Sequence, residues 1–125
     1  MTTEEQLIKL VKSIASVSAQ LHRKGINHGD LYAHNILINE FADCLLGDFG
    51  AATYYNTSSV LAHNIERVEV RAFGCLVEDL LSLVEESSRR NVPFEKWLKL
   101  IDKCRVPTVE TRLSFAEIVC ELAGF

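Results

Sequence analysis

The residues whose chemistry stands out fall in two short stretches of the chain. Residues 28–35 read His-Gly-Asp-Leu-Tyr-Ala-His-Asn, and residues 47–50 read Gly-Asp-Phe-Gly. The side chains of Asp30, Asn35 and Asp48 offer oxygen atoms, which hard divalent cations take as ligands. Two short apolar runs separate the stretches and predict a β-hairpin that turns the chain back. We therefore expect the hairpin to bring the two stretches to one point.

A transition-metal site is an alternative for the first stretch. His28, Asp30 and His34 carry imidazole and carboxylate groups, which suit zinc or iron. No further histidine or cysteine stands close by in the sequence, and zinc sites usually take several such ligands. We therefore favour a structural role for His28, in which its ring hydrogen-bonds to nearby backbone groups.

In order and spacing, the two stretches resemble the catalytic loop and the D-F-G motif of protein kinases. Residues 21–28 are similar to the end of the kinase helix that leads into this loop. Residues 69–76 are similar to the start of the central kinase helix, and residues 112–115 to the arginine segment before the last helix. The chain thus resembles the C-terminal lobe of a kinase, which implies a mostly α domain with a small β-hairpin, of the α+β kinase superfamily, over residues 1–125.

This resemblance implies roles for four residues in Mg-ATP-dependent phosphoryl transfer to a protein hydroxyl. Such transfer needs positioning and charge neutralisation more than covalent help from the protein. By the resemblance, Asp30 accepts the proton of the attacking hydroxyl, and Asn35 and Asp48 hold the Mg²⁺ that bridges the ATP phosphates. Asp30 and Asn35 are the implied catalytic pair, whereas Leu37, as the apolar floor under the adenine, and Asp48 are the implied nucleotide contacts.

The sequence departs from the kinase pattern at several positions. Gly29 replaces an arginine and Tyr32 replaces a lysine beside the catalytic aspartate, so the histidine-glycine-aspartate spelling also resembles small-molecule kinases of the aminoglycoside and choline type. Glu69 replaces the aspartate of the central helix. Arg112 has no evident counterpart of its usual acidic partner, although Glu66 is the nearest candidate. A small molecule is therefore an alternative acceptor.

Parts of the kinase pattern that clamp ATP have no counterpart in these 125 residues. We find no glycine-rich loop, no V-A-I-K lysine and no glutamate helix to pair with it. We therefore expect turnover to need an N-terminal lobe or a partner, which leaves open whether the chain alone is an enzyme. The strand around Leu37 would lie uncovered and favour association with another protein or with a second copy. A catalytically inactive, pseudokinase-like interaction module is the alternative from another functional class.

Composition narrows the class of protein further. Over 125 residues, 48% are hydrophobic and 24% are charged, which predicts one globular domain. The net charge of −4 and the lack of a basic stripe argue against nucleic acid or an anionic membrane as a partner. No long apolar run or signal-peptide pattern is present, so we expect a cytoplasmic protein. The widely separated cysteines favour buried, reduced thiols.

Apolar periodicity predicts four helices and one hairpin. The first helix carries its apolar face over residues 7–21, with a capping box at Thr2 and Glu5 and a stop at Gly25. Residues 49–64 follow neither the helix nor the strand period and are expected to form a loop. The remaining elements are strands at 36–38 and 44–46 and helices at 68–86, 94–104 and 114–122, the last with a capping box of Ser114 and Glu117.

Overall fold

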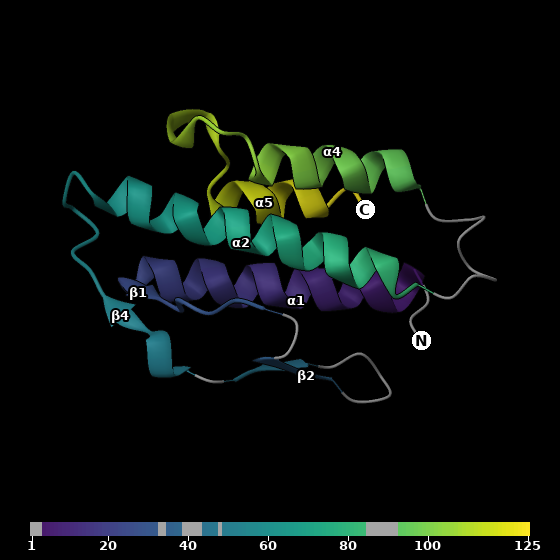
Figure 1. The fold of residues 1–125 in the computed structure, drawn as a ribbon, viewed down its shortest axis with the longest axis horizontal. Coiled ribbons are helices and arrows are strands. Elements are labelled where there is room, and N and C mark those ends of the chain that lie inside the picture. The colour runs from purple at the N-terminus through teal and green to yellow at the C-terminus, as the bar shows by residue number, and fades with distance from the viewer. Residues whose placement is uncertain (1–3, 33–34, 39–43, 48, 85–92) are drawn as a thin grey trace.

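The structure, a computed structural model, describes residues 4–32, 35–38, 44–47, 49–84 and 93–125. Within these residues four α-helices form the body of the molecule, and two short ladders of strands lie along one side of it (Figure 1). The predicted class, mostly α with a small β-hairpin, is confirmed.

Helix α1 spans Glu4–Arg23 and confirms the predicted first helix. Its apolar side chains recur every three or four residues, so that residues such as Leu7 and Ile14 lie on one buried face. Gly25 follows the helix with a φ of 72°, a left-handed conformation that costs little only where no β-carbon is present. Of the predicted N-terminal capping box, Thr2 lies outside the described residues.

The predicted hairpin is confirmed in position and pairing. Strand β2, Ile36–Ile38, pairs antiparallel with strand β3, Cys44–Leu46. The register sets Ile36 opposite Leu46, so the two ends of the hairpin that adjoin the candidate site lie side by side. Residues 39–43, which join the strands, lie outside the described residues.

A second ladder was not predicted. Strand β1, Ile26–Asn27, pairs antiparallel with strand β4, Thr53–Tyr54, immediately before the catalytic-loop stretch. The expectation of an irregular loop over 49–64 is therefore wrong in part, since a 3₁₀ turn at Phe49–Ala51 also forms there. Strands of two residues are too short to show an alternating pattern, which explains why the sequence does not reveal them.

Helix α2 spans Ala62–Ser82, whereas the sequence pattern predicted a helix over 68–86. The start is earlier because polar residues in the first two turns interrupt the apolar pattern, although Ala62 itself is buried. The helix ends earlier because the amide of Leu83 bonds back to the carbonyl groups of the last turn.

The last two helices lie where the pattern placed them. Helix α4 spans Phe94–Cys104, and helix α5 spans Phe115–Leu122. The predicted capping box is present: the Glu117 amide donates to the Ser114 hydroxyl at 3.1 Å, and the Ser114 amide donates to the Glu117 carboxylate at 3.0 Å.

The helices pack around one apolar core. Helix α1 packs against α5 and α2, and α2 packs against α4, as the parallel ribbons in Figure 1 show. The rings of Phe73 and Phe115 meet edge to face at the centre, with centroids 5.3 Å apart. Trp97 on α4 is fully buried and packs against Phe125. None of the helices in the described ranges is long and apolar enough to cross a membrane.

Only part of the expectation for the cysteines holds. Cys75, Cys104 and Cys120 are free thiols. Cys104 is buried, and burial raises the pKa of its thiol to about 12, which makes it unreactive. Cys120 is exposed, contrary to the expectation, because its position on the short helix α5 turns away from the core.

Candidate active site

The backbone folds tightly between Asp30 and Asn35. The side-chain Nδ2 of Asn35 donates to the carbonyl oxygen of Asp30 at 2.7 Å, and the amide of Tyr32 donates to the same oxygen at 3.0 Å. Asn35 is buried and Asp30 is half-buried. Among the residues that the structure describes, none hydrogen-bonds to the carboxylate of Asp30 or to the amide oxygen of Asn35. This turn therefore joins the side chain of Asn35 to the backbone of Asp30.

His28 connects this turn to the returning strand of the hairpin. Its buried ring accepts the amide proton of Asp30 at Nδ1, over 3.1 Å, and donates from Nε2 to the carbonyl oxygen of Gly47 at 2.8 Å. A single tautomer, with the proton on Nε2, makes both bonds. The amide of Gly47 in turn donates to the carbonyl of Asn35 at 2.8 Å. His28 is thus structural, as expected.

The two neighbours of Asp48 both contact His28. Gly47 accepts its Nε2 proton, and the ring of Phe49 packs edge to face on the imidazole with centroids 4.7 Å apart. The second predicted stretch therefore meets the first at this histidine. Asp48 itself lies outside the described residues, so its predicted part in a cation site stays a prediction.

Glu69 of helix α2 holds the backbone that leads into Asp30. Its Oε1 accepts the amide of His28 at 3.1 Å and Nε2 of His22 at 3.0 Å, and its Oε2 accepts the amide of Gly29 at 2.7 Å. Burial by itself raises the pKa of Glu69, but the bonds from His22 and the two amides outweigh it and hold this pKa below its ordinary value. Glu69 is therefore an ionised anchor inside the protein.

Gly29 has a conformation that explains its residue type. Its φ is 84°, and a β-carbon on it would collide with the carbonyl oxygen of Ala51. Only glycine meets both conditions without strain. The arginine that kinases carry here would not fit this backbone, because the loop at residue 29 and the 3₁₀ turn at Phe49–Ala51 lie too close together for a side chain.

Comparison with known proteins gives matches to kinases. Residues 2–53 match the family described as "Lipopolysaccharide kinase (Kdo/WaaP) family". CTD kinase subunit alpha of Schizosaccharomyces pombe is 42% identical over 59 residues, which are 47% of this chain and 10% of that protein. Serine/threonine-protein kinase US3 of Human herpesvirus 1 is 40% identical over 53 residues, 42% of this chain and 11% of that protein. A probable cyclin-dependent serine/threonine-protein kinase of Dictyostelium discoideum is 34% identical over 53 residues, 42% of this chain and 8% of that protein.

Over about its first half, the chain is similar to kinases. The matched part spans about a tenth of the length of these curated relatives. The family match ends at residue 53, so it includes both stretches from which the candidate site is built.

Two candidate site residues remain, Leu37 and His34. Leu37 lies in β2, paired with Leu45, and its predicted contact with adenine stays a prediction. His34, a member of the alternative metal site, lies outside the described residues. Among the residues that the structure describes, no group of three histidine, cysteine, aspartate or glutamate side chains is placed to hold a metal ion.

Arg112 has partners other than the one expected. Its Nε and Nη2 donate to the carbonyl oxygen of Val106 at 2.9 and 2.8 Å, and its Nη1 donates to that of Arg67 at 2.7 Å. The expectation that Glu66 pairs with it is wrong, because the Glu66 carboxylate faces Tyr55 and Arg67 instead. Backbone carbonyl groups satisfy this buried guanidinium, and they leave no signature in a sequence.

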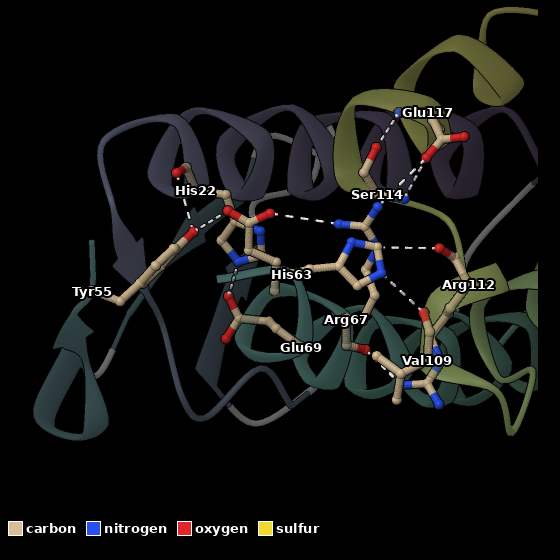
Figure 2. A network of polar contacts seen from close by, with 10 residues as sticks. His22, Tyr55, His63, Arg67, Glu69, Val109, Arg112, Ser114 and Glu117 are labelled. Carbon is tan, nitrogen blue, oxygen red and sulfur yellow. Dashed lines mark hydrogen bonds and ion pairs between the residues drawn. The ribbon is translucent and has the colours of Figure 1, made fainter. Parts of the chain in front are cut away.

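The sequence analysis did not predict the contacts among His22, Tyr55 and Glu66. They belong to a polar network between α1, the β4 segment and α2, which Figure 2 shows together with the contacts of Arg67 and Arg112. A histidine next to the last residue of the first helix gave no signal, and a tyrosine inside a polar segment looks like any loop residue.

A cleft with a volume of about 220 Å³ adjoins this network. It is lined by residues of α1, α2 and α5 and by one residue of the intervening segment, which are Ala19, His22, Arg23, Thr57, Glu66, Ser114, Phe115 and Ala116. Neither Asp30 nor Asn35 lines it. The cleft is therefore separate from the candidate active site.

Proposed function

We propose that this chain supplies the phosphoryl-transfer lobe of a kinase-like enzyme that uses Mg²⁺ and ATP. The observation that carries the proposal is the turn in which Asn35 bonds to the backbone of Asp30. This bond engages the nitrogen of the Asn35 amide and, within the described residues, leaves the amide oxygen and the Asp30 carboxylate without a protein partner. Carboxylate and amide oxygens are a donor set that fits Mg²⁺ and not a soft metal.

Each residue has a role in this proposal. Asp30 accepts the proton of the attacking hydroxyl, and Asn35 together with Asp48 holds the cation. Leu37 would contact the base of the nucleotide. Bound Mg-ATP supplies the phosphoryl group and the positive charge that neutralises it.

The remaining contacts support the proposal through positioning. Glu69 accepts hydrogen bonds from the amides of His28 and Gly29, and His28 Nδ1 accepts one from the amide of Asp30. The proposed catalytic base, Asp30, therefore stands on a backbone segment with little freedom to move. Fixing a base in its reactive position is a large part of what such an enzyme contributes.

The acceptor we propose is a protein hydroxyl, because the curated relatives include serine/threonine-protein kinases. A small molecule such as a sugar is the second candidate. The match of residues 2–53 to the lipopolysaccharide kinase family favours it. Transfer of labelled phosphate to protein and to sugar acceptors, compared side by side, separates the two.

Calorimetric titration of the full-length protein with ATP, with and without Mg²⁺, tests the proposal. We expect magnesium-dependent binding that weakens at least about tenfold in Asp48→Ala, the effect of losing a charged ligand worth about 1.4 kcal/mol or more. Asp79→Ala, which removes an exposed carboxylate of α2, is the matched control and should bind as the parent does. Binding without magnesium dependence, or equal binding by both variants, would reject the proposal and favour the interaction module.

A further inference from the structure

Tyr55 lies where the segment after the candidate site meets the end of α1. Its amide donates to the carbonyl of Gly25 at 2.8 Å. A β-carbon on Gly25 would stand 2.5 Å from the carbonyl oxygen of Tyr55, so the two backbones leave no room for a side chain. The backbone of Tyr55 is therefore fitted closely against the turn that precedes β1.

The hydroxyl of Tyr55 links two helices. It lies 2.5 Å from Oε2 of Glu66 on α2 and 3.1 Å from the carbonyl oxygen of His22 on α1 (Figure 2). A hydroxyl has one proton to donate, so the two acceptors share it in a three-centre hydrogen bond, of which the shorter arm goes to the Glu66 carboxylate. Burial, reinforced by Glu66, raises the pKa of Tyr55, so the residue stays a neutral phenol.

The contacts continue from His22 to the backbone before Asp30. The ring of His22 is 6% exposed and meets the ring of Tyr55 edge to face, with centroids 6.2 Å apart. Its Nε2 bonds to Oε1 of Glu69 at 3.0 Å, and Glu69 holds the amides of the two residues that precede Asp30. An unbroken series of contacts thus joins the Tyr55 hydroxyl to the candidate base.

We propose that Tyr55 and Glu66 are positioning residues, which hold His22 against Glu69 and thereby fix the loop that carries Asp30. The statement that this loop is catalytic rests on the proposed function, whereas the link from Tyr55 through His22 and Glu69 to the loop does not. The two can therefore fail separately.

The experiment measures amide hydrogen exchange at residues 28 and 29 in the full-length protein, by mass spectrometry with fragmentation that resolves single amides. Tyr55→Phe keeps the ring and removes the hydroxyl. We expect these two amides to exchange at least about threefold faster, the factor that one net hydrogen bond gives. Tyr54→Phe is the matched control, because it removes a hydroxyl from the neighbouring residue, which is 86% exposed.

A second pair of variants tests the same coupling from α2. Glu66→Ala should raise exchange at residues 28 and 29 as Tyr55→Phe does, while Glu66→Gln, which keeps an acceptor oxygen, should restore most of the protection. Equal exchange in Tyr55→Phe and Tyr54→Phe would overturn the proposal. So would a uniform increase over the core amides of α2 and α5, because that result would show general destabilisation without a specific link to the loop. If the parent protein did not bind Mg-ATP, the proposed function would be rejected, but the result of the exchange experiment would still decide whether Tyr55 and Glu66 position the loop.

Discussion

At the scale of single residues, the buried carboxylate of Glu69 has the largest consequences for the site. Both of its oxygens accept hydrogen bonds, from the amides of His28 and Gly29 and from the ring of His22. Each buried donor that loses such a partner costs about 1–3 kcal/mol. One side chain on the central helix therefore determines both the stability of the loop and the position of Asp30.

We predict that Glu69→Gln lowers the free energy of unfolding by about 2–3 kcal/mol near neutral pH, because the amide replaces an ionised acceptor with a group that also donates. Since folding holds the pKa of Glu69 below its ordinary value of 4.5, the ionised form stabilises the native state above that value. This stabilisation is lost as the pH falls through the lower, folded pKa. Urea unfolding over a series of pH values measures it.

The difference between the parent and Glu69→Gln should therefore shrink as the pH falls below 4.5. Glu110→Gln, which changes an exposed carboxylate, is the control and should leave the curve of stability against pH nearly unchanged. A difference that stays constant down to low pH would contradict the role of Glu69 as an ionised anchor.

At the scale of elements, the close approach of α2 and α4 depends on one glycine. A β-carbon on Gly74 would stand 2.8 Å from Cβ of Cys104 and 3.0 Å from Cγ of Arg105. Alanine gains about 1 kcal/mol of helix propensity over glycine, whereas overpacking a core costs about 1–3 kcal/mol. The Cβ of Cys104 belongs to a buried residue close to the backbone and moves little, so the overpacking outweighs the gain.

We therefore predict that Gly74→Ala destabilises the protein by about 1 kcal/mol, measured by chemical denaturation. Asn64→Ala, at an exposed position of the same helix, provides the comparison, because it gains helix propensity without a clash and should be neutral or stabilising. If Gly74→Ala were as stable as Asn64→Ala, the two helices would have to be packed more loosely than the structure shows.

The elements also show what the sequence could reveal. Helices with a long apolar face, such as α1 and α4, and the capping box of Ser114 and Glu117 follow from local patterns, and the structure confirms them. The β1–β4 ladder and the partners of Arg112 are set by contacts between segments far apart in the chain. Such contacts leave no local pattern, so they are predictable only from the fold.

The same distinction applies to the candidate site. The sequence predicts that Asp30, Asn35 and Asp48 converge on one cation, which stays a prediction, whereas the bond from the Asn35 side chain to the backbone of Asp30 follows only from the fold. The contacts among His22, Tyr55 and Glu66 were not predicted. The apolar pattern placed the start of α2 at residue 68, whereas the helix begins at Ala62 and therefore includes Glu66, the partner of the Tyr55 hydroxyl.

At the scale of the whole molecule, one core connects all the helices of the described part. The buried cluster draws side chains from α1, α2, α4 and α5, and Phe73 and Phe115 bring α2 and α5 together at its centre. A core shared in this way predicts that the helices unfold together, because no helix keeps its buried face covered once another leaves.

Trp97 allows this prediction to be tested with one built-in probe. It is the single tryptophan of the chain, it lies on α4, and it is fully buried. We expect tryptophan fluorescence, which reports on α4, and far-ultraviolet circular dichroism, which reports on all the helices, to give coincident urea transitions for the 125-residue chain. The slope should be about 1–3 kcal/mol per molar urea, as for other small domains. Leu98→Ala, at an exposed position beside the probe, should leave both curves nearly in place. If the fluorescence transition came clearly before the dichroism transition, α4 would be a separately unfolding unit, and the prediction of one domain over residues 1–125 would be wrong.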